Sequence, residues 1–413
     1  MEIPSKKRER STMENSEQTN TCDLSSSFCI QIANHALLEE AEKGSNFVIS
    51  PVSFQIMLSL VATGATGRTL DQLLLFMESK SIEDLNSLSS HVVELTTRQD
   101  NDDKNLAAGP LVTMVNGAWV DQSFGLKPSF KGTLTDVYKA EAKAVDFATR
   151  ASKVTEEVNK WAQDATEGLI KDLLPSGSLG SDTALVFANA LYFKGAWDRK
   201  FDSERSTNKD FTLLTGQIIQ VPCMTTKRKE RHLYREINGY KILKIPYQSG
   251  QDMRKFAMFF FLPTEINGLQ NMMQNFNSTP GFFNQDFYFG EEDLGDRIWI
   301  PKFKFSYEFE ASRIIKELGL VLPFMDVGEF TELVHSQHGG KVCVSNIFHK
   351  SYIEVNEEGT EAAASTAVRF RRCCGRVKPP GFVADHPFMF MIREETSRIV
   401  FFTGAVLNPL LAT

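Results

Sequence analysis

The chain has 413 residues, of which 42% are hydrophobic and 23% charged, and its formal net charge is −7. This composition is ordinary for a globular protein, and the acidic balance excludes a general binder of nucleic acid or of anionic membranes. The longest continuous apolar runs, such as FAMFFFL at 256–262, are far too short to span a membrane.

Six cysteines are scattered along the chain: Cys22, Cys29, Cys223, Cys343, Cys373 and Cys374. They form no Cys-x-x-Cys pair and no Cys/His spacing suited to zinc, so we predict no metal site and no structural disulfide. This pattern favours a reducing compartment, and the adjacent pair at 373–374 is either redox-sensitive or without a role.

The first 22 residues are polar and have no apolar segment of the kind that a secretory signal needs. We predict a disordered extension over 1–22 and a cytoplasmic protein. The run KKRER at 6–10 matches nuclear-import patches, a pattern with many false positives, so nuclear entry is left open. No low-complexity linker divides the remainder, which predicts a single domain over 23–413.

In chain order, apolar spacing predicts an amphipathic helix over 23–43 that ends at Gly44. Ser50 and Pro51 have the residue types of an N-cap and a first helical position, and predict a buried helix that ends at Gly64. Thr69 is predicted to cap a third helix. Further on, the pattern predicts a loop over 98–109, buried strands over 111–120 and 184–193, and an amphipathic helix over 152–174.

Strands and turns alternate from 210 to 310, and a short helix over 311–318 is predicted to end at Gly319. The apolar segment 341–355 leads into a polar stretch. Beyond that stretch, 388–392 and 398–407 are apolar on both faces, which predicts a buried hairpin around 395–397. Helices mixed with mainly antiparallel strands indicate an α+β fold.

The polar stretch between these apolar segments has an alternating pattern that is compatible with a strand. One parity holds Thr360, Ala362, Ala364, Thr366, Val368 and Phe370, and none of these is charged. The other parity holds Glu361, Ala363, Ser365, Ala367 and Arg369, which places both charges on one face. Since alternate side chains of a strand point to opposite faces, this exposed segment could enter a sheet with its neutral face inward. An alanine-rich helix or a disordered linker is the alternative.

Six fragments resemble the serpin family and keep the family's order: NFVISPVSF (46–54), NALYFKGAW (189–197), VPCM (221–224), PKFKFS (301–306), IEVNEEGTEAAA (353–364) and HPFMFMIRE (386–394). The form VADHPF at 383–388 is similar to plant serpins in particular. The resemblance covers nearly the whole chain. It implies a serpin fold with three β-sheets, about nine helices and an exposed reactive-centre loop over about 357–384.

The resemblance also implies a function: inhibition of serine or cysteine endopeptidases by a suicide-substrate trap. The protease cleaves the loop, an acyl-enzyme forms, and residues 360–370 insert into the central sheet. The inhibitory hinge that the resemblance assigns consists of Glu357, Glu358, Gly359, Thr360, Glu361, Ala362, Ala363, Ala364, Ser365 and Thr366. The predicted partner is the target endopeptidase, held covalently by a monomer without a cofactor. A serpin-fold binding protein that does not inhibit is the alternative.

The family's spacing from Gly359 places the cleaved bond between Cys373 and Cys374. Arg372–Cys373 is the alternative, because an arginine suits proteases with an acidic specificity pocket. The resemblance assigns control of sheet opening to Ser50, Ser53, Asn189 and His349, and loop entry to Trp197. A helix cap, a core histidine and core packing are the plain structural alternatives.

The sequence holds no GxSxG, HExxH or GxGxxG motif and no complete phosphate loop, so we predict that the protein is not an enzyme. A nucleophile at Cys373 would need a histidine and an oxyanion hole on rigid structure, which a mobile loop does not provide.

Overall fold

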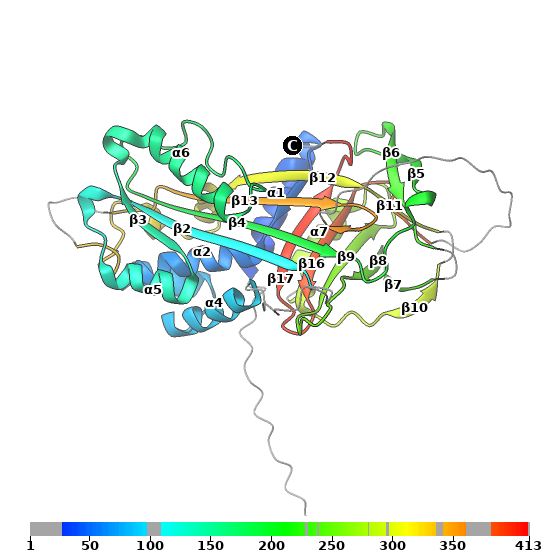
Figure 1. The fold of residues 1–413 in the computed structure, drawn as a ribbon, viewed down its shortest axis with the longest axis horizontal. Coiled ribbons are helices and arrows are strands. Elements are labelled where there is room, and N and C mark those ends of the chain that lie inside the picture. Colours follow the sequence, from blue (N-terminus) through cyan, green and yellow to red (C-terminus); the bar gives the residue numbers. More distant parts are fainter. Residues whose placement is uncertain are drawn as a thin grey trace, which may run out of the picture.

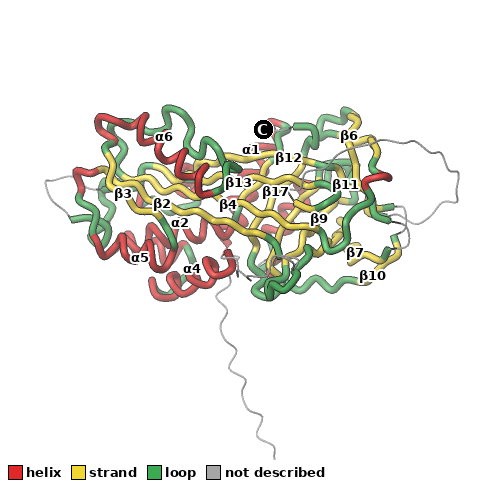
Figure 2. Tube along the Cα trace, viewed as in Figure 1, coloured by secondary structure: helices red, strands yellow, loops and turns green. Residues whose placement is uncertain are grey.

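The computed structural model describes residues 27–96, 109–227, 230–237, 239–279, 281–294, 297–335, 342–360 and 381–411. Within these ranges the chain forms three β-sheets and eight α-helices (Figures 1 and 2), which confirms the predicted α+β fold. The extension predicted over 1–22 and nearly all of the loop predicted over 98–109 lie outside the described residues. None of the described helices is long and apolar enough to cross a membrane.

The helices are α1 (Ser27–Lys43), α2 (Pro51–Gly64), α3 (Gly67–Phe76), α4 (Ile82–Thr96), α5 (Pro128–Tyr138), α6 (Phe147–Ala165), α7 (Leu269–Asn277) and α8 (Ser312–Glu317). The predicted start of α2 is confirmed, since the Ser53 N–H donates to Ser50 Oγ at 3.1 Å. The predicted cap at Thr69 is wrong. Thr66 occupies the N-cap position, and Thr69 lies within α3, where its hydroxyl accepts from the N–H of Glu329.

The observed helix α6 begins and ends earlier than the helix predicted over 152–174. Asp146 caps α6 by accepting from the N–H of Thr149 at 2.9 Å. The helix cannot continue past Ala165, because Glu167 and Gly168 have positive φ angles of 52° and 84°. The helices α4, α5 and α7 were not predicted from the sequence. The prediction of strands and turns alone over 210–310 is therefore wrong at Leu269–Asn277, where α7 lies.

Three sheets contain all the described strands. The central sheet has the order β12 (Phe303–Glu310), β13 (Asn346–Val355), β14 (Gly359–Thr360), β4 (Leu185–Ala196), β2 (Leu111–Asp121) and β3 (Glu141–Val145). The core sheet has the order β1 (Phe47–Ile49), β17 (Val400–Val406), β16 (Phe388–Glu394), β9 (Phe256–Pro263), β8 (Tyr240–Pro246), β7 (Arg231–Ile237) and β10 (Gly290–Asp293). The small sheet has the order β15 (Phe382–Val383), β11 (Ile298–Pro301), β6 (Ile218–Met224) and β5 (Thr207–Thr212).

Helices cover both faces of the central sheet (Figure 1). On β4, the alternate residues Val186, Ala188, Ala190 and Tyr192 pack in one cluster with apolar residues of α6. Their neighbours Leu185, Phe187, Leu191 and Phe193 belong to the main core, which includes α2. Every one of these residues is buried, because the strand is covered on both sides. Asn189 shares the parity of the second set and therefore points to the α2 side.

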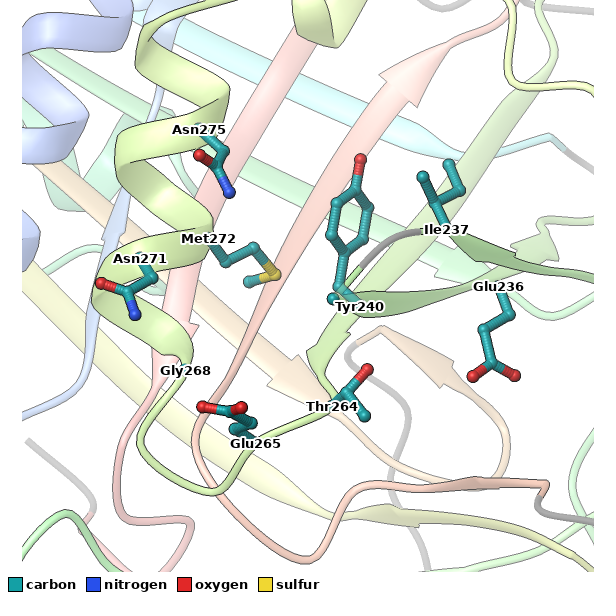
Figure 3. A pocket seen from close by; sticks show the side chains of 10 residues that line it. Glu236, Ile237, Tyr240, Thr264, Glu265, Gly268, Asn271, Met272 and Asn275 are labelled. Carbon is teal, nitrogen blue, oxygen red and sulfur yellow. The ribbon is translucent and has the colours of Figure 1, made fainter.

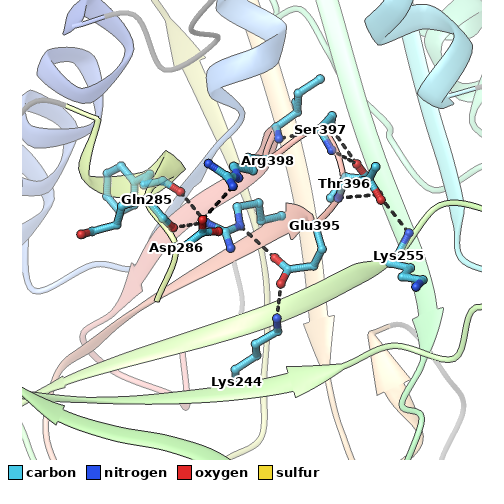
Figure 4. Close-up of polar contacts among 12 residues, drawn as sticks. Lys244, Lys255, Gln285, Asp286, Glu395, Thr396, Ser397 and Arg398 are labelled. Atoms are coloured by element: carbon cyan, nitrogen blue, oxygen red, sulfur yellow. Dashed lines mark hydrogen bonds and ion pairs between the residues drawn. The ribbon is translucent and has the colours of Figure 1, made fainter. Parts of the chain in front are cut away.

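The predicted hairpin around 395–397 is confirmed, and Figure 4 shows its turn residues Glu395, Thr396 and Ser397. Glu394 is 1% exposed and accepts from the N–H groups of Lys255, Thr396 and Ser397. Burial would raise the pKa of Glu394, but these hydrogen bonds outweigh it and the net pKa is lowered. This ionised carboxylate fixes the end of β16 against the start of β9.

Candidate functional site: the β13–β4 seam and the hinge

The seam is the parallel pairing of β13 with β4, in which residues 346–352 lie opposite 186–192. At the carboxyl end of this pairing the strands are separated by the two-residue strand β14. Gly359 and Thr360 lie antiparallel to Ala196 and Gly195 of β4, and Thr360 also pairs with Val355 of β13. Two residues of the predicted hinge, Gly359 and Thr360, are thus already part of the central sheet.

A tight turn at Asn356 reverses the chain from β13 into β14. The Asn356 side-chain oxygen accepts from the N–H groups of Glu358 and Gly359 at 2.9 and 3.3 Å. Neighbouring carbonyls are also bonded, since the N–H of Trp197 donates to Glu358 O and the N–H of Phe201 donates to Glu357 O, each at 3.0 Å. The turn is therefore held from within and from the segment that follows β4.

Only glycine fits at position 359. A Cβ placed there would lie 2.0 Å from the carbonyl oxygen of Gly195 and 2.8 Å from the Cα of Ala196. Both atoms belong to the backbone of β4 and cannot rotate aside. The close approach of β14 to β4 thus requires the glycine that the sequence places after two glutamates.

Two aromatic side chains support β14 from the core side. Thr360 is 1% exposed, and its hydroxyl lies 2.6 Å from the hydroxyl of Tyr247. The Tyr247 ring stacks on Trp197 with centroids 4.5 Å apart, and Trp197 Nε1 donates to Asn356 O at 2.8 Å. Burial raises the pKa of Tyr247, so its phenol stays protonated and can serve as donor or acceptor to Thr360.

Glu357 anchors the turn to a second sheet. Its side chain is 3% exposed, and its Oε1 accepts from Ser206 Oγ at 2.6 Å and lies 3.1 Å from Lys302 Nζ. Lys302 connects β11 of the small sheet to β12 of the central sheet. Burial would raise the pKa of Glu357, but these partners outweigh it and lower the pKa overall. By contrast, Glu358 lies near the surface, where it pairs with Lys200 at 2.5 Å.

A polar network crosses the middle of the directly paired part of the seam, at the fourth of its seven residue pairs. His349 of β13 donates from Nδ1 to Asn189 Oδ1 of β4 at 2.9 Å, so one side-chain hydrogen bond crosses the seam. His349 Nε2 accepts from the N–H of Ser50 at 3.2 Å and from Ser351 Oγ at 2.7 Å. Asn189 Nδ2 in turn donates to Asn116 Oδ1 of β2 at 2.7 Å.

This network requires a neutral imidazole. His349 is fully buried, and burial lowers its pKa to about 3. A proton on Nε2 would point at the N–H of Ser50, so the network would lose an acceptor and gain a buried charge.

The structure brings four of the five predicted sheet-opening residues together. Ser50 and Ser53 lie at the start of α2, where they contact the His349 and Asn189 pair through Ser50. Ser53 contributes its N–H, while its hydroxyl has no hydrogen-bond partner among the described residues. Trp197 lies at the hinge end of the seam, where it contacts Asn356. The roles of these residues in sheet opening stay predictions.

Sequence reasoning missed several residues of the site: Tyr247, Ser206, Lys302, Asn116 and Ser351. Lys302 lies inside the quoted fragment PKFKFS, and Tyr247 lies in the stretch 210–310 where alternating strands and turns are predicted. No spacing links either residue to the hinge. The hinge from Glu361 to Thr366 lies outside the described residues, together with Arg372, Cys373 and Cys374. Of the cysteines that the structure describes, Cys29, Cys223 and Cys343 form no disulfide.

Comparisons with known proteins agree with this architecture. A model of the serpin (serine protease inhibitor) family matches residues 23–409. Serpin-ZX of Arabidopsis thaliana is 43% identical over 391 residues, which cover 94% of this chain and 98% of the relative. Serpin-ZXA of Oryza sativa subsp. japonica is 43% identical over 370 residues, covering 89% and 91%. The native stressed conformation of Arabidopsis AtSerpin1 matches with a TM-score of 0.83 and 40% identity, over 95% of this chain and 98% of that one. The chain belongs to the serpin family.

Proposed function

We propose that this protein inhibits serine or cysteine endopeptidases by trapping them as a covalent acyl-enzyme. Serpins generally inhibit proteases, and this chain has plant serpins as relatives. The observation that carries the proposal is the direction of β14, which runs antiparallel to both β13 and β4. A strand that entered the seam after loop cleavage would continue β14 without any change of direction or register.

The register of β14 supports this reading. Thr360 lies opposite Val355 and Gly195, so continued antiparallel pairing places Thr366 opposite both His349 and Asn189. The inserted strand would thus separate the two side chains whose hydrogen bond now crosses the seam. Its neutral parity, which begins at the buried Thr360, would face the core, and the charged parity would face α6.

The exchange of strand pairs supplies the free energy of the trap. Insertion breaks the parallel pairing of 346–352 with 186–192 and forms two antiparallel ladders in its place. The loop residues also gain backbone hydrogen bonds that a solvated loop lacks. The intact protein is then metastable, and the network at His349 contributes to the kinetic barrier that protects it.

The chemistry belongs to the protease. Its serine or cysteine attacks the scissile carbonyl carbon, the C–N bond breaks, and the protease's own base transfers the nucleophile's proton to the new amine. An ester or thioester then joins the two proteins. Loop insertion moves the protease before water can hydrolyse this bond. The inhibitor supplies a peptide bond and the segment that inserts, and it needs neither a catalytic centre nor a cofactor.

The bond that is cut is Cys373–Cys374 or Arg372–Cys373. The first choice follows the family's spacing from Gly359. The second choice places arginine before the bond and suits a trypsin-like protease. Mass spectrometry of the released C-terminal fragment separates the two, since its first residue is Cys374 in one case and Cys373 in the other.

The test is incubation of the full chain with trypsin-like and papain-like proteases, followed by denaturing electrophoresis. We expect an adduct that survives detergent and has the summed mass of the protease and the cleaved inhibitor. Nicking of the loop should also raise the melting temperature sharply, because the inserted strand stabilises the sheet. If the loop is cut without an adduct and without stabilisation, the protein is a serpin-fold protein that does not inhibit.

A further inference from the structure

The segment 381–388 joins β15 of the small sheet to β16 of the core sheet, and it contains the VADHPF motif. Phe382 is fully buried, and β15 pairs with β11. The N–H of Ala384 donates to Trp299 O at 2.9 Å, so the pairing extends one residue beyond the strand. This segment therefore anchors the C-terminal end of the predicted reactive-centre loop to the body of the protein.

Both ring nitrogens of His386 in this segment face hydrogen-bond acceptors. Nδ1 lies 2.7 Å from Asp385 Oδ1, and Nε2 lies 2.9 Å from the carbonyl oxygen of Pro263 at the end of β9. A carboxylate and a carbonyl cannot donate, so each hydrogen bond needs an N–H group of the ring, and a neutral imidazole has only one. Turning the ring over would place C–H groups near these positions, far closer than the about 3.3–3.6 Å of such contacts. The geometry therefore requires a ring with both nitrogens protonated.

The additional proton belongs to the imidazole and not to the carboxyl group. The side chain of Asp385 is 55% exposed, so water stabilises its ionised form. His386 is 5% exposed, and a buried charge is tolerated when it is paired and hydrogen-bonded, as it is here. The seam histidine is the opposite case, because His349 Nε2 accepts from the N–H of Ser50 and so must be neutral.

The strands and turns around this segment carry the other charged or titratable groups: Lys209 and Asp210 of β5, Cys223 of β6, Tyr240 and Lys241 of β8, Glu265 between β9 and α7 (Figure 3), and Arg297 before β11. The two lysines bind elsewhere, since Lys209 Nζ lies 4.0 Å from the centroid of the Trp299 ring and Lys241 donates to Gly381 O at 3.3 Å. Within the described part of the chain, Asp385 is the ionisable group that contacts the imidazole. Because cations and carboxylates both surround the segment, this direct contact decides the sign of the effect.

We propose that His386 is an imidazolium in the folded protein and acts as the positioning residue that ties the loop's C-terminal anchor to the core sheet. A histidine in the unfolded chain is neutral above about pH 6.5, so stabilisation by the charged ring is complete below that pH and is lost as the pH rises. This sign is opposite to that of the buried, neutral His349. The consequence for presenting the loop to a protease rests on the proposed function, whereas the charge and the anchor do not.

The charge is tested by nitrogen NMR of the full chain with ¹⁵N-labelled histidines at pH 7.5. The signal that His386→Gln removes belongs to this ring. We expect it to show hydrogen on both nitrogens, whereas an ordinary histidine is about nine-tenths neutral at this pH. The proposal is overturned if this signal has one bare nitrogen, because the ring is then neutral.

The anchor is tested by hydrogen exchange of 382–386 at pH 6 and pH 9, corrected for the intrinsic pH dependence of exchange. In the wild type we expect protection to decrease about tenfold at the higher pH, because a buried hydrogen bond from a charged group is lost. His386→Gln should show the lower protection at both pH values. His91→Gln, at an exposed position on α4, is the matched control and should behave like the wild type.

Protection of 400–406 in the buried hairpin should stay the same in all three proteins, which separates release of the anchor from global unfolding. Equal wild-type protection of 382–386 at pH 6 and pH 9 would overturn the proposal, and this comparison needs no variant. Both measurements use the free protein. A failure to trap proteases would therefore contradict the proposed function without changing either result.

Discussion

The hinge end of the β13–β4 seam and the part in which β13 and β4 pair directly have opposite characters. At the hinge end, β14 already separates the strands. Thr360 of β14 is held by a hydrogen bond, and Glu357 of the preceding turn forms an ion pair with Lys302. Beyond β14, β13 and β4 pair directly, and a neutral His349 in the middle of the paired residues bridges them to α2; we call this paired part the closed end. One end is open and anchored, whereas the other is closed and held by uncharged hydrogen bonds.

This difference predicts that a strand enters the seam from the hinge end. An entering strand gains a template at the hinge end, because β14 fixes the register of the residues that follow. It meets the largest local resistance at His349 and Asn189, where buried hydrogen bonds must break before new ones form. We therefore expect changes at the hinge end to decide whether insertion begins, and changes at His349 to affect the stability of the closed seam.

The substitution Thr360→Arg should have the largest effect, because it blocks the open end. Thr360 is 1% exposed against Tyr247, so an arginine there would bury an unpaired charge at a cost of several kcal/mol. We expect a variant that the target protease cleaves normally but that forms no detergent-stable adduct. Gel electrophoresis after incubation with the protease measures this directly.

Thr135→Arg is a matched control, since it adds the same side chain to an exposed position on α5. It should trap the protease as the wild type does. Normal trapping by the Thr360→Arg variant would show that insertion does not begin at β14.

The substitution Glu357→Lys should release the hinge end from the small sheet. It replaces a buried ion pair with two like charges, because Lys302 lies beside the same position. The expected loss is about 3–5 kcal/mol, the range for leaving a buried charge unpaired. Urea unfolding monitored by circular dichroism should show a lower midpoint. The double variant with Lys302→Glu restores opposite charges and should recover part of the loss; if it recovers none, the pair does not hold the turn.

Much of the fold and part of the candidate site could be predicted from the sequence, and each wrong or missing prediction has a physical reason. The Ser50 cap, the buried strands at 111–120 and 184–193 and the hairpin around 395–397 were predictable because their signals are local. The role of Thr69 was not predictable, because its hydroxyl accepts a hydrogen bond from the N–H of Glu329, which is distant in the sequence. The role of Tyr247 was not predictable either. In the sequence it resembles an ordinary strand residue, and only the folded structure brings its hydroxyl to that of Thr360. Contacts between segments that are far apart in the sequence produce no recognisable residue spacing.

The substitution Tyr247→Phe isolates one hydrogen bond at the open end. It keeps the ring that stacks on Trp197 and leaves the buried hydroxyl of Thr360 without its partner. The expected cost is about 1–3 kcal/mol. Hydrogen exchange by mass spectrometry should show faster exchange at 356–360 and unchanged exchange at 346–352. Tyr288→Phe, at an exposed position, is the control. Equal protection of 356–360 in both variants would show that the hydroxyl pair does not hold β14.

Acidification should weaken the closed end of the seam. His349 has a pKa of about 3 in the folded protein and about 6.5 when unfolded, so the unfolded state binds the extra proton between these values. Stability from this group is complete above pH 6.5 and decreases as the pH falls toward 3. Between pH 7.5 and 5.5 the free energy of unfolding should decrease by about 1.4 kcal/mol on this account. The lowered pKa values of Glu357 and Glu394 act below 4.5, outside this window.

His232 on β7 provides the matched comparison, because burial lowers its pKa to about 4 and gives the same sign of pH dependence. The two residues lie in different sheets, so their contributions should add. In urea titrations at both pH values, His349→Gln and His232→Gln should each remove about half of the shared loss, and the double variant should remove both halves. Only His349→Gln should change hydrogen exchange along 346–352. A His349→Gln protein that keeps the full wild-type pH dependence would mean that the imidazole is already charged in the folded state, and that the closed end is not held by a neutral network.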